Sequence, residues 1–209
     1  GHVHIMADTE ALGEAGVRFL VEMAAYPEAD RRVCVPTVTD PRGADFKSYE
    51  RIRHDERFVG LERRAVEAFR LMDVMMTDTC INYQVFMSPV FGEHVAFGDT
   101  GSSIYTNSVL GARTNFEGGP SALAAALTGR TPRYGYHLDE RRHGTTLFHV
   151  SAQPESYSDW GALGGLVGRE MQHYWEVPVI DGIELMPTSD ELKHFGAALA
   201  SFGSTPLFH

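Results

Sequence analysis

The chemically richest part of the sequence lies between residues 107 and 120 and has the sequence NSVLGARTNFEGGP. Amide, hydroxyl, guanidinium and carboxylate side chains stand there between glycines, and Pro120 suits the first turn of a helix. The N–H groups at a helix start favour carboxylates and phosphates, and Arg113 could hold the same anion through two hydrogen bonds. The alternative is a structural turn in which Arg113 and Glu117 pair. We expect a substrate site made by Asn107, Ser108, Arg113, Thr114, Asn115 and Glu117.

Three further side chains could move protons or line the same site. Glu93 and His94 are adjacent, and since neighbouring residues of a strand face opposite ways, they need not act together. His137 stands in YGYHLDERR (134–142), where it could line a site or be a buried histidine with satisfied hydrogen bonds. The histidines show no spacing typical of a zinc site, and the chain has no phosphate loop or dinucleotide motif.

Of the two cysteines, Cys80 is the candidate for chemistry. It stands in TDTCINYQ (77–84), directly after an apolar stretch. A thiol there could bind a metal, although a single cysteine is more often a small buried hydrophobic residue. Cys34 lies in the apolar stretch RVCVP and is expected in the core. Two cysteines cannot form a disulfide framework and indicate a reducing compartment, so we expect a cytoplasmic protein.

These side chains need a scaffold, and the hydrophobic pattern indicates alternating helices and strands. It predicts helices at 8–26, 56–72, 119–128, 158–173 and 189–200. It predicts strands at 32–36, 73–76, 145–150 and 177–180, and the start of a strand at 204–208. This alternation is typical of an α/β fold with a mainly parallel sheet flanked by helices. Ligands bind beyond the carboxyl ends of such strands, where we expect Cys80 and the 110–119 loop.

Composition excludes several classes of function. The 209 residues carry a formal net charge of −10, whereas a nucleic-acid-binding protein usually shows a basic stripe. The short arginine pairs are diluted by acidic residues, so we expect no nucleic-acid partner. No apolar run is long enough to span a membrane, and the sequence has no signal peptide, so we expect no membrane association. A small anionic substrate would need only one or two local cations.

Two stretches resemble the aconitase X family almost continuously: GEHVAF (92–97) and NSVLGARTNFEGGPSALAAALTGRTPRYGYHLDERR (107–142). Weaker matches are ALGEAGVRFL (11–20) and VCVPTVTDPRGAD (33–45), and TDTCINYQ (77–84) matches the region of the family's cluster loop. The resemblance covers most of the chain. It implies an aconitase-like α/β architecture and an iron–sulfur hydro-lyase that removes water from a small hydroxy acid.

The resemblance also implies site residues and partners. The family's first cluster cysteine falls on Cys80, as a ligand of a 2Fe-2S or 4Fe-4S cluster, and its polar active-site loop falls on residues 107–117. Arg113 and the loop amides would hold the substrate carboxylate, and the acid or supporting groups would be Glu93, His94 and His137. The catalytic base would come from the small subunit or a fused small domain. The family's large subunit is about twice as long, so we expect residues 1–209 to be part of one large-subunit catalytic region.

The family has two known substrates, and the sequence favours one of them. GDTGSSIYTNS (98–108) and NFEGG (115–119) look closer to the enzymes that convert cis-3-hydroxy-L-proline to pyrroline-2-carboxylate. The mevalonate 5-phosphate dehydratases tend to have TCTPY where residues 79–83 are TCINY, and NREGG where residues 115–119 are NFEGG. Mevalonate 5-phosphate remains the alternative substrate. A different class also stays open, namely a non-catalytic domain that binds a carboxylate or a partner.

Overall fold

The computed structural model describes the backbone of residues 1–209 and every side chain except those of residues 9–11. The chain forms two compact units, which we describe separately. Unit 1 comprises Gly1–Ser88, Ala96–Asp99 and Glu117–Thr131. Unit 2 comprises Pro89–Val95, Thr100–Phe116 and Pro132–His209.

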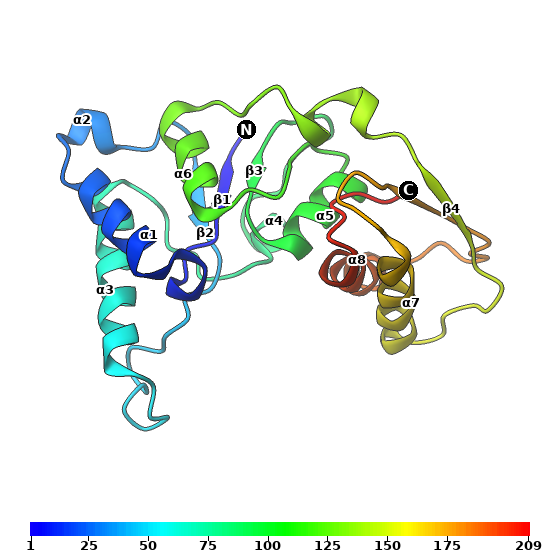
Figure 1. The fold of residues 1–209 in the computed structure, drawn as a ribbon, viewed down its shortest axis with the longest axis horizontal. Coiled ribbons are helices and arrows are strands. Elements are labelled where there is room, and N and C mark those ends of the chain that lie inside the picture. Colours follow the sequence, from blue (N-terminus) through cyan, green and yellow to red (C-terminus); the bar gives the residue numbers. More distant parts are fainter. The chain divides into compact units, whose positions relative to one another are not determined.

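Unit 1 is built on a parallel sheet with the strand order β2-β1-β3 (Figure 1). The strands are β1 (Val3–Ile5), β2 (Thr37–Thr39) and β3 (Ala96–Phe97). His4 of the central strand pairs in register with Val38 on one side and Phe97 on the other. Since all three strands are parallel, their carboxyl ends meet at one edge, which we call the carboxyl edge of the sheet.

Three helices form the hydrophobic core of unit 1 with this sheet: α1 (Thr9–Ala24), α3 (Glu56–Leu71) and α6 (Gly119–Thr128). Val3 and Ile5 contribute to this core from β1. Gly13 interrupts α1 with φ 61°, and Gly129 ends α6 in the left-handed region that glycine adopts readily. Two single-turn helices, α2 (Glu28–Arg31) and α4 (Asn82–Val85), complete the unit.

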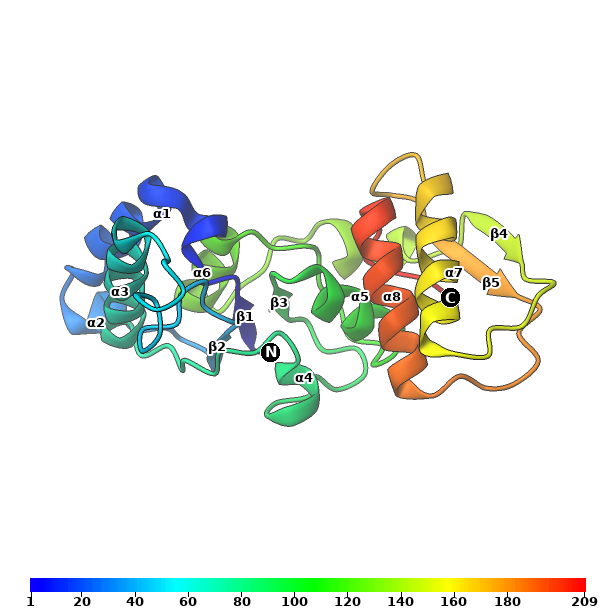
Figure 2. The ribbon, with the colours of Figure 1, turned by 90° about the horizontal axis from the view of Figure 1, so that it is seen from below.

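Unit 2 packs helices against one small parallel sheet (Figure 2). Its elements are α5 (Thr100–Ser108), the 3-10 turns Gly135–His137 and Asp139–Arg141, β4 (Thr146–His149), α7 (Tyr157–Glu170), β5 (Pro178–Asp181) and α8 (Ser189–Gly203). Helices α7 and α8 approach closely at Gly168, which has no side chain. A Cβ at this position would lie 2.8 Å from the carbonyl oxygen of Leu199. Capping boxes at Ser156 and Thr188 begin the two helices.

The predicted α/β class and the five long helices are confirmed, as are the strands at 145–150 and 177–180. Three predicted strands are not formed. Residues 32–36 are not a strand, because the N–H groups of Val33 and Cys34 donate to the ends of α3 and α6, and β2 begins after Pro36. Of the stretch 73–76, only Met75 forms an isolated bridge, to Val38. Residues 204–208 form no strand, although His209 exchanges backbone hydrogen bonds with Pro178 and Ile180.

No helix in the described part of the chain is long and apolar enough to cross a membrane.

Candidate functional site

An aspartate follows each strand of the unit 1 sheet within three residues of its end. Asp8 follows β1, Asp40 comes directly after β2, and Asp99 follows β3. The register of the sheet places these positions at the carboxyl edge. This edge of a parallel sheet is where ligands of α/β proteins usually bind.

Asp40 is the buried member of this set, with 5% of its surface exposed. One carboxylate oxygen accepts a hydrogen bond from the N–H of Ala7 at 2.7 Å, which joins the end of β2 to the end of β1. Burial, and then the negative charges of Asp8 and Asp99, raise the pKa of Asp40 to about 7. A carboxyl group with such a pKa can exchange a proton near neutral pH, and a cation at this edge would be attracted.

The loop that carries Cys80 is fixed to the same edge by Asn82. The side-chain amide of Asn82 donates to the carbonyl oxygens of Thr39 and Thr79, at 3.0 and 2.6 Å. The thiol of Cys80 is exposed and unpaired. Partial burial, followed by the charges of Asp99 and Asp40, raises the pKa of this thiol. A thiolate at Cys80 therefore needs a cation or a metal beside it.

The structure tests whether this chain could hold an iron–sulfur cluster by itself. Such clusters are held by several cysteine thiolates. The residues whose side chains are described include no group of three or more histidine, cysteine, aspartate or glutamate residues placed to hold a metal ion. Cys80 could therefore supply one ligand, and the side chains that the structure describes do not by themselves complete a cluster site.

Asn107 is the centre of the polar network in unit 2. Its amide nitrogen donates to the carbonyl oxygens of Thr114 and Pro206, both at 2.9 Å. Its amide oxygen accepts from the N–H of Thr114 at 3.0 Å and from Arg142 at 2.9 Å. The side chain is buried and its hydrogen-bonding groups are all used within the protein. Asn107 therefore sets the path of the 107–116 loop.

The side chains of His94 and His137 lie in direct contact. Their rings stack with centroids 5.1 Å apart, and their Nδ1 atoms lie 2.9 Å apart. His137 is buried, whereas His94 is exposed. Burial, then His94 and the guanidinium groups of Arg113 and Arg142, lower the pKa of His137 to about 4. His137 is therefore neutral at physiological pH, and His94 is the exposed ring of the pair.

Arg113 lies beside this pair but does not pair with Glu117. One of its nitrogens donates to the carbonyl oxygen of His137 at 3.0 Å, and the other forms an ion pair with Asp139. The side chain of Asp139 is 81% exposed, against 24% for Arg113. A substrate carboxylate could therefore replace Asp139 without any change in the buried part of the network.

The remaining predicted site residues have structural partners. The hydroxyl of Ser108 accepts from the N–H of Phe208 at 2.9 Å, and that of Thr114 donates to the carbonyl oxygen of Asn115. The amide oxygen of Asn115 accepts from the N–H of Tyr136 at 2.8 Å. Glu93 accepts from the N–H of Val90 in its own turn.

Units 1 and 2 divide the predicted site residues between them. Glu117 is buried in unit 1, where its N–H donates to the carbonyl oxygen of Phe97, and Cys80 lies in the same unit. The other eight lie in unit 2: Glu93, His94, Asn107, Ser108, Arg113, Thr114, Asn115 and His137.

Sequence reasoning missed the aspartates of the carboxyl edge and Arg142. The aspartates were missed because β1 and β3 are too short to give a clear strand pattern. An aspartate directly after a short apolar stretch was the available signal. Arg142 belongs to one of the short arginine pairs of the sequence, and it donates to Asn107 and to the carbonyl oxygen of Tyr136. Burial lowers the pKa of Arg142 to about 10.

Two family descriptions match consecutive parts of the chain. Residues 1–140 match the Aconitase X first domain, and residues 144–209 match the Aconitase X second domain.

Two curated relatives and one solved structure illustrate the similarity. The chain is 40% identical over 200 residues to the phosphomevalonate dehydratase large subunit of Methanothermobacter thermautotrophicus, covering 96% of this chain and 48% of the relative. It is 32% identical over 202 residues to the cis-3-hydroxy-L-proline dehydratase of Pseudomonas aeruginosa, covering 94% and 33%. The crystal structure of Thermococcus kodakaraensis aconitase X in its holo-form matches with a TM-score of 0.86 and 35% identity, covering 100% and 50%. The chain thus spans half or less of the length of these proteins.

Proposed function

Since the chain belongs to the aconitase X family, we propose that it is part of the large subunit of an iron–sulfur-dependent dehydratase. Its substrate would be a small hydroxy acid, most simply cis-3-hydroxy-L-proline, and its product pyrroline-2-carboxylate. The relatives' names support the reaction class, since both groups are dehydratases. The name "large subunit" supports a small subunit, or a fused small domain, as partner. The two unpaired cysteines support a reducing compartment, and we propose the cytoplasm.

We propose Cys80 as the cluster ligand that this chain contributes, with the other ligands outside residues 1–209. The position of Cys80 supports this role, because Asn82 fixes its loop to the carboxyl edge of the sheet. Hydroxide is a poor leaving group, and an iron–sulfur cluster, when bound, supplies the Lewis acid that such a group needs.

The chain's own residues would bind the substrate and move its protons. Arg113 would hold the substrate carboxylate in place of Asp139 and stabilise charge that develops on it. His94, paired with the neutral His137, would exchange a proton with the reacting groups. We propose that Asn107 acts by holding the loop that carries Arg113, because its polar atoms are occupied. The base that removes the Cα proton would come from the small subunit.

The acidic carboxyl edge is the observation that favours hydroxyproline. A 3-hydroxyproline carries a secondary ammonium group, whereas mevalonate 5-phosphate carries only negative charges. Burial is the main cause that raises the pKa of Asp40 to about 7, and the negative charges of Asp8 and Asp99 raise it further. An ammonium group would relieve this repulsion, and a phosphate would add to it. Arg42, which follows Asp40 by two residues, already pairs with Asp78.

A specific observation favours mevalonate 5-phosphate as the second candidate. The chain is 40% identical to the phosphomevalonate dehydratase large subunit of M. thermautotrophicus but 32% identical to the P. aeruginosa hydroxyproline enzyme. Identity over the whole chain mostly reflects the fold, whereas the charge of the carboxyl edge would act directly on a substrate bound there. We therefore give the carboxyl edge more weight.

The two cysteines allow a matched test of the cluster. Cys80→Ala and Cys34→Ala would each be made in a polypeptide of the relatives' full length that contains this chain, hereafter the complete large subunit, purified anaerobically with its small subunit. We expect Cys80→Ala to lose iron, sulfide and dehydratase activity together. Cys34→Ala should keep all three, since the Cys34 thiol only donates to the carbonyl oxygen of Leu127. Full iron content and activity in Cys80→Ala would overturn the ligand assignment.

A further inference from the structure

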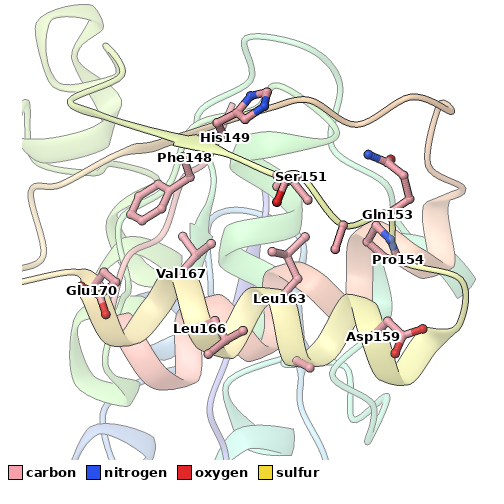
Figure 3. Close-up of a pocket in the computed structure, with 13 residues that line it drawn as sticks. Phe148, His149, Ser151, Gln153, Pro154, Asp159, Leu163, Leu166, Val167 and Glu170 are labelled. Carbon is pink, nitrogen blue, oxygen red and sulfur yellow. The ribbon is translucent and has the colours of Figure 1, made fainter.

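Unit 2 carries an apolar groove between β4 and α7, with a volume of about 520 Å³ (Figure 3). Phe148 extends from β4 towards the helix, and Leu163 and Val167 extend from α7 towards the strand. The spacing of the α7 residues that line the groove places them on one face of the helix. These residues are Asp159, Ala162, Leu163, Leu166, Val167 and Glu170. One side of the groove is therefore a continuous face of α7, and the other side is β4 with the residues that follow it.

The centre of this face is apolar and only partly covered, and Asp159 and Glu170 lie at its two ends. Leu166 is 61% exposed, whereas Val167 is 3% exposed because it also packs in the core that α7 forms with α8. A second groove of about 520 Å³ shares Gln153 and Pro154 with the first and carries Leu185 and Met186, which are 81% and 91% exposed. Apolar surface gathered in this way usually marks a protein interface.

The strand above the groove has an unused edge. β4 pairs with β5 in parallel, and the other edge of β5 exchanges backbone hydrogen bonds with His209. Among the residues that the structure describes, no strand pairs with the second edge of β4. The N–H of Val150 donates to Asp181 on β5, so strand alternation directs the N–H of His149 to this second edge. Parallel sheets are normally larger and covered on both faces.

The length of the relatives identifies an occupant. The solved T. kodakaraensis protein contains all of this chain's fold within 50% of its own length. Parallel strands are joined by crossover connections within one polypeptide, so the rest of such a chain is the natural source of a strand and of apolar side chains. We propose that the groove and the free edge of β4 are covered by the part of the large-subunit polypeptide that lies outside residues 1–209.

The test is site-specific thiol labelling in the complete large subunit, which needs no activity and so does not depend on the proposed reaction. Leu166→Cys lies in the groove. Ile52→Cys is the matched control, because Ile52 is similarly exposed, at 57%, and lies in unit 1. Labelling with a maleimide, read at each cysteine by peptide mass spectrometry, should be at least about tenfold slower at position 166, since a covered thiol reacts only when the structure opens. Equal rates would overturn the proposal.

Two additional arms test the occupant. If position 166 is protected from labelling only when the small subunit is present, the occupant is the small subunit and the proposal is overturned. If the protection increases with protein concentration, the occupant is a second copy and the proposal is likewise overturned. Amide hydrogen exchange of the complete large subunit without any substitution tests the same proposal independently of the cysteine variants. Slow exchange at the amide of His149 without the small subunit would support the proposal, and fast exchange would overturn it.

Discussion

The Nδ1 atoms of His94 and His137 lie 2.9 Å apart, so the two stacked imidazoles share one hydrogen bond. One ring donates and the other accepts, which requires at least one of them to be neutral. A proton on His137 would add a positive charge to a buried ring that already lies in the field of Arg113 and Arg142. The pair is therefore sensitive to acid.

His137→Asn should make the stability of the protein less dependent on pH. The pKa of His137 is about 4 in the folded protein against an ordinary 6.5, so the unfolded chain takes up this proton first. Stability is then lost as the pH falls from 6.5 towards 4, by on the order of 3 kcal/mol. Asparagine does not titrate. Urea unfolding at pH 7 and pH 5 should show a smaller loss for the variant, and equal losses would contradict this role.

Asp40→Asn should stabilise the protein above pH 7 while reducing its activity. The pKa of Asp40 is raised to about 7 from an ordinary 3.8, so the folded state is penalised increasingly as the pH rises from 4 to 7. Asparagine can still accept from Ala7, and removing the charge should add up to about 1.4 kcal/mol per pKa unit. Denaturation at pH 8 and pH 4 tests this, and a variant less stable than the original at pH 8 would refute it.

Gly164→Ala and Gly161→Ala should change stability in opposite directions, although both lie in α7. A Cβ on Gly164 would overlap the carbonyl group of Phe195 on α8, whereas nothing lies within 4 Å of a Cβ on Gly161. We expect a loss of about 2 kcal/mol or more at position 164, and a gain of up to about 1 kcal/mol at position 161 from helix propensity. Thermal unfolding measures both, and a stabilised Gly164→Ala protein would be inconsistent with the close contact of the helices.

Arg113→Lys and Asp139→Asn should move the KM for the hydroxy acid in opposite directions. Lysine cannot make the two-pronged contact with a carboxylate, so KM should rise by about tenfold. Asp139→Asn removes the exposed partner that competes with the substrate, so KM should fall. The ion pair is largely exposed at Asp139, so we expect neither variant to change the stability of the protein appreciably. If neither variant alters KM, Arg113 has only a structural role.

The elements with strong local signals could be predicted from the sequence. Helix α3 has a clear apolar face with Asp55 as its cap, and α6 has proline in its first turn and Gly129 at its end. By contrast, α5 contains one glycine and is rich in serine and threonine, which favour turns and caps over helix interiors. Six of its nine residues are nevertheless buried, and this burial within the fold, which no local pattern shows, stabilises the helix.

The candidate site was only partly predictable for the same physical reason. Residue types identified His94, His137 and Arg113 as candidates, but only the folded chain shows that Arg113 pairs with Asp139 and not with Glu117. The pKa of Asp40 depends on burial and on aspartates that are distant in sequence. Such properties arise from three-dimensional contacts, and sequence spacing does not reveal them.

The most direct test of the account is a dehydration assay of the complete large subunit with its small subunit, purified anaerobically, on cis-3-hydroxy-L-proline and on mevalonate 5-phosphate in parallel. The acidic carboxyl edge around Asp40 predicts formation of pyrroline-2-carboxylate from the first compound and no turnover of the second. Turnover of mevalonate 5-phosphate alone would contradict the assignment of the substrate. An intact cluster without turnover of either compound would contradict the proposed reaction.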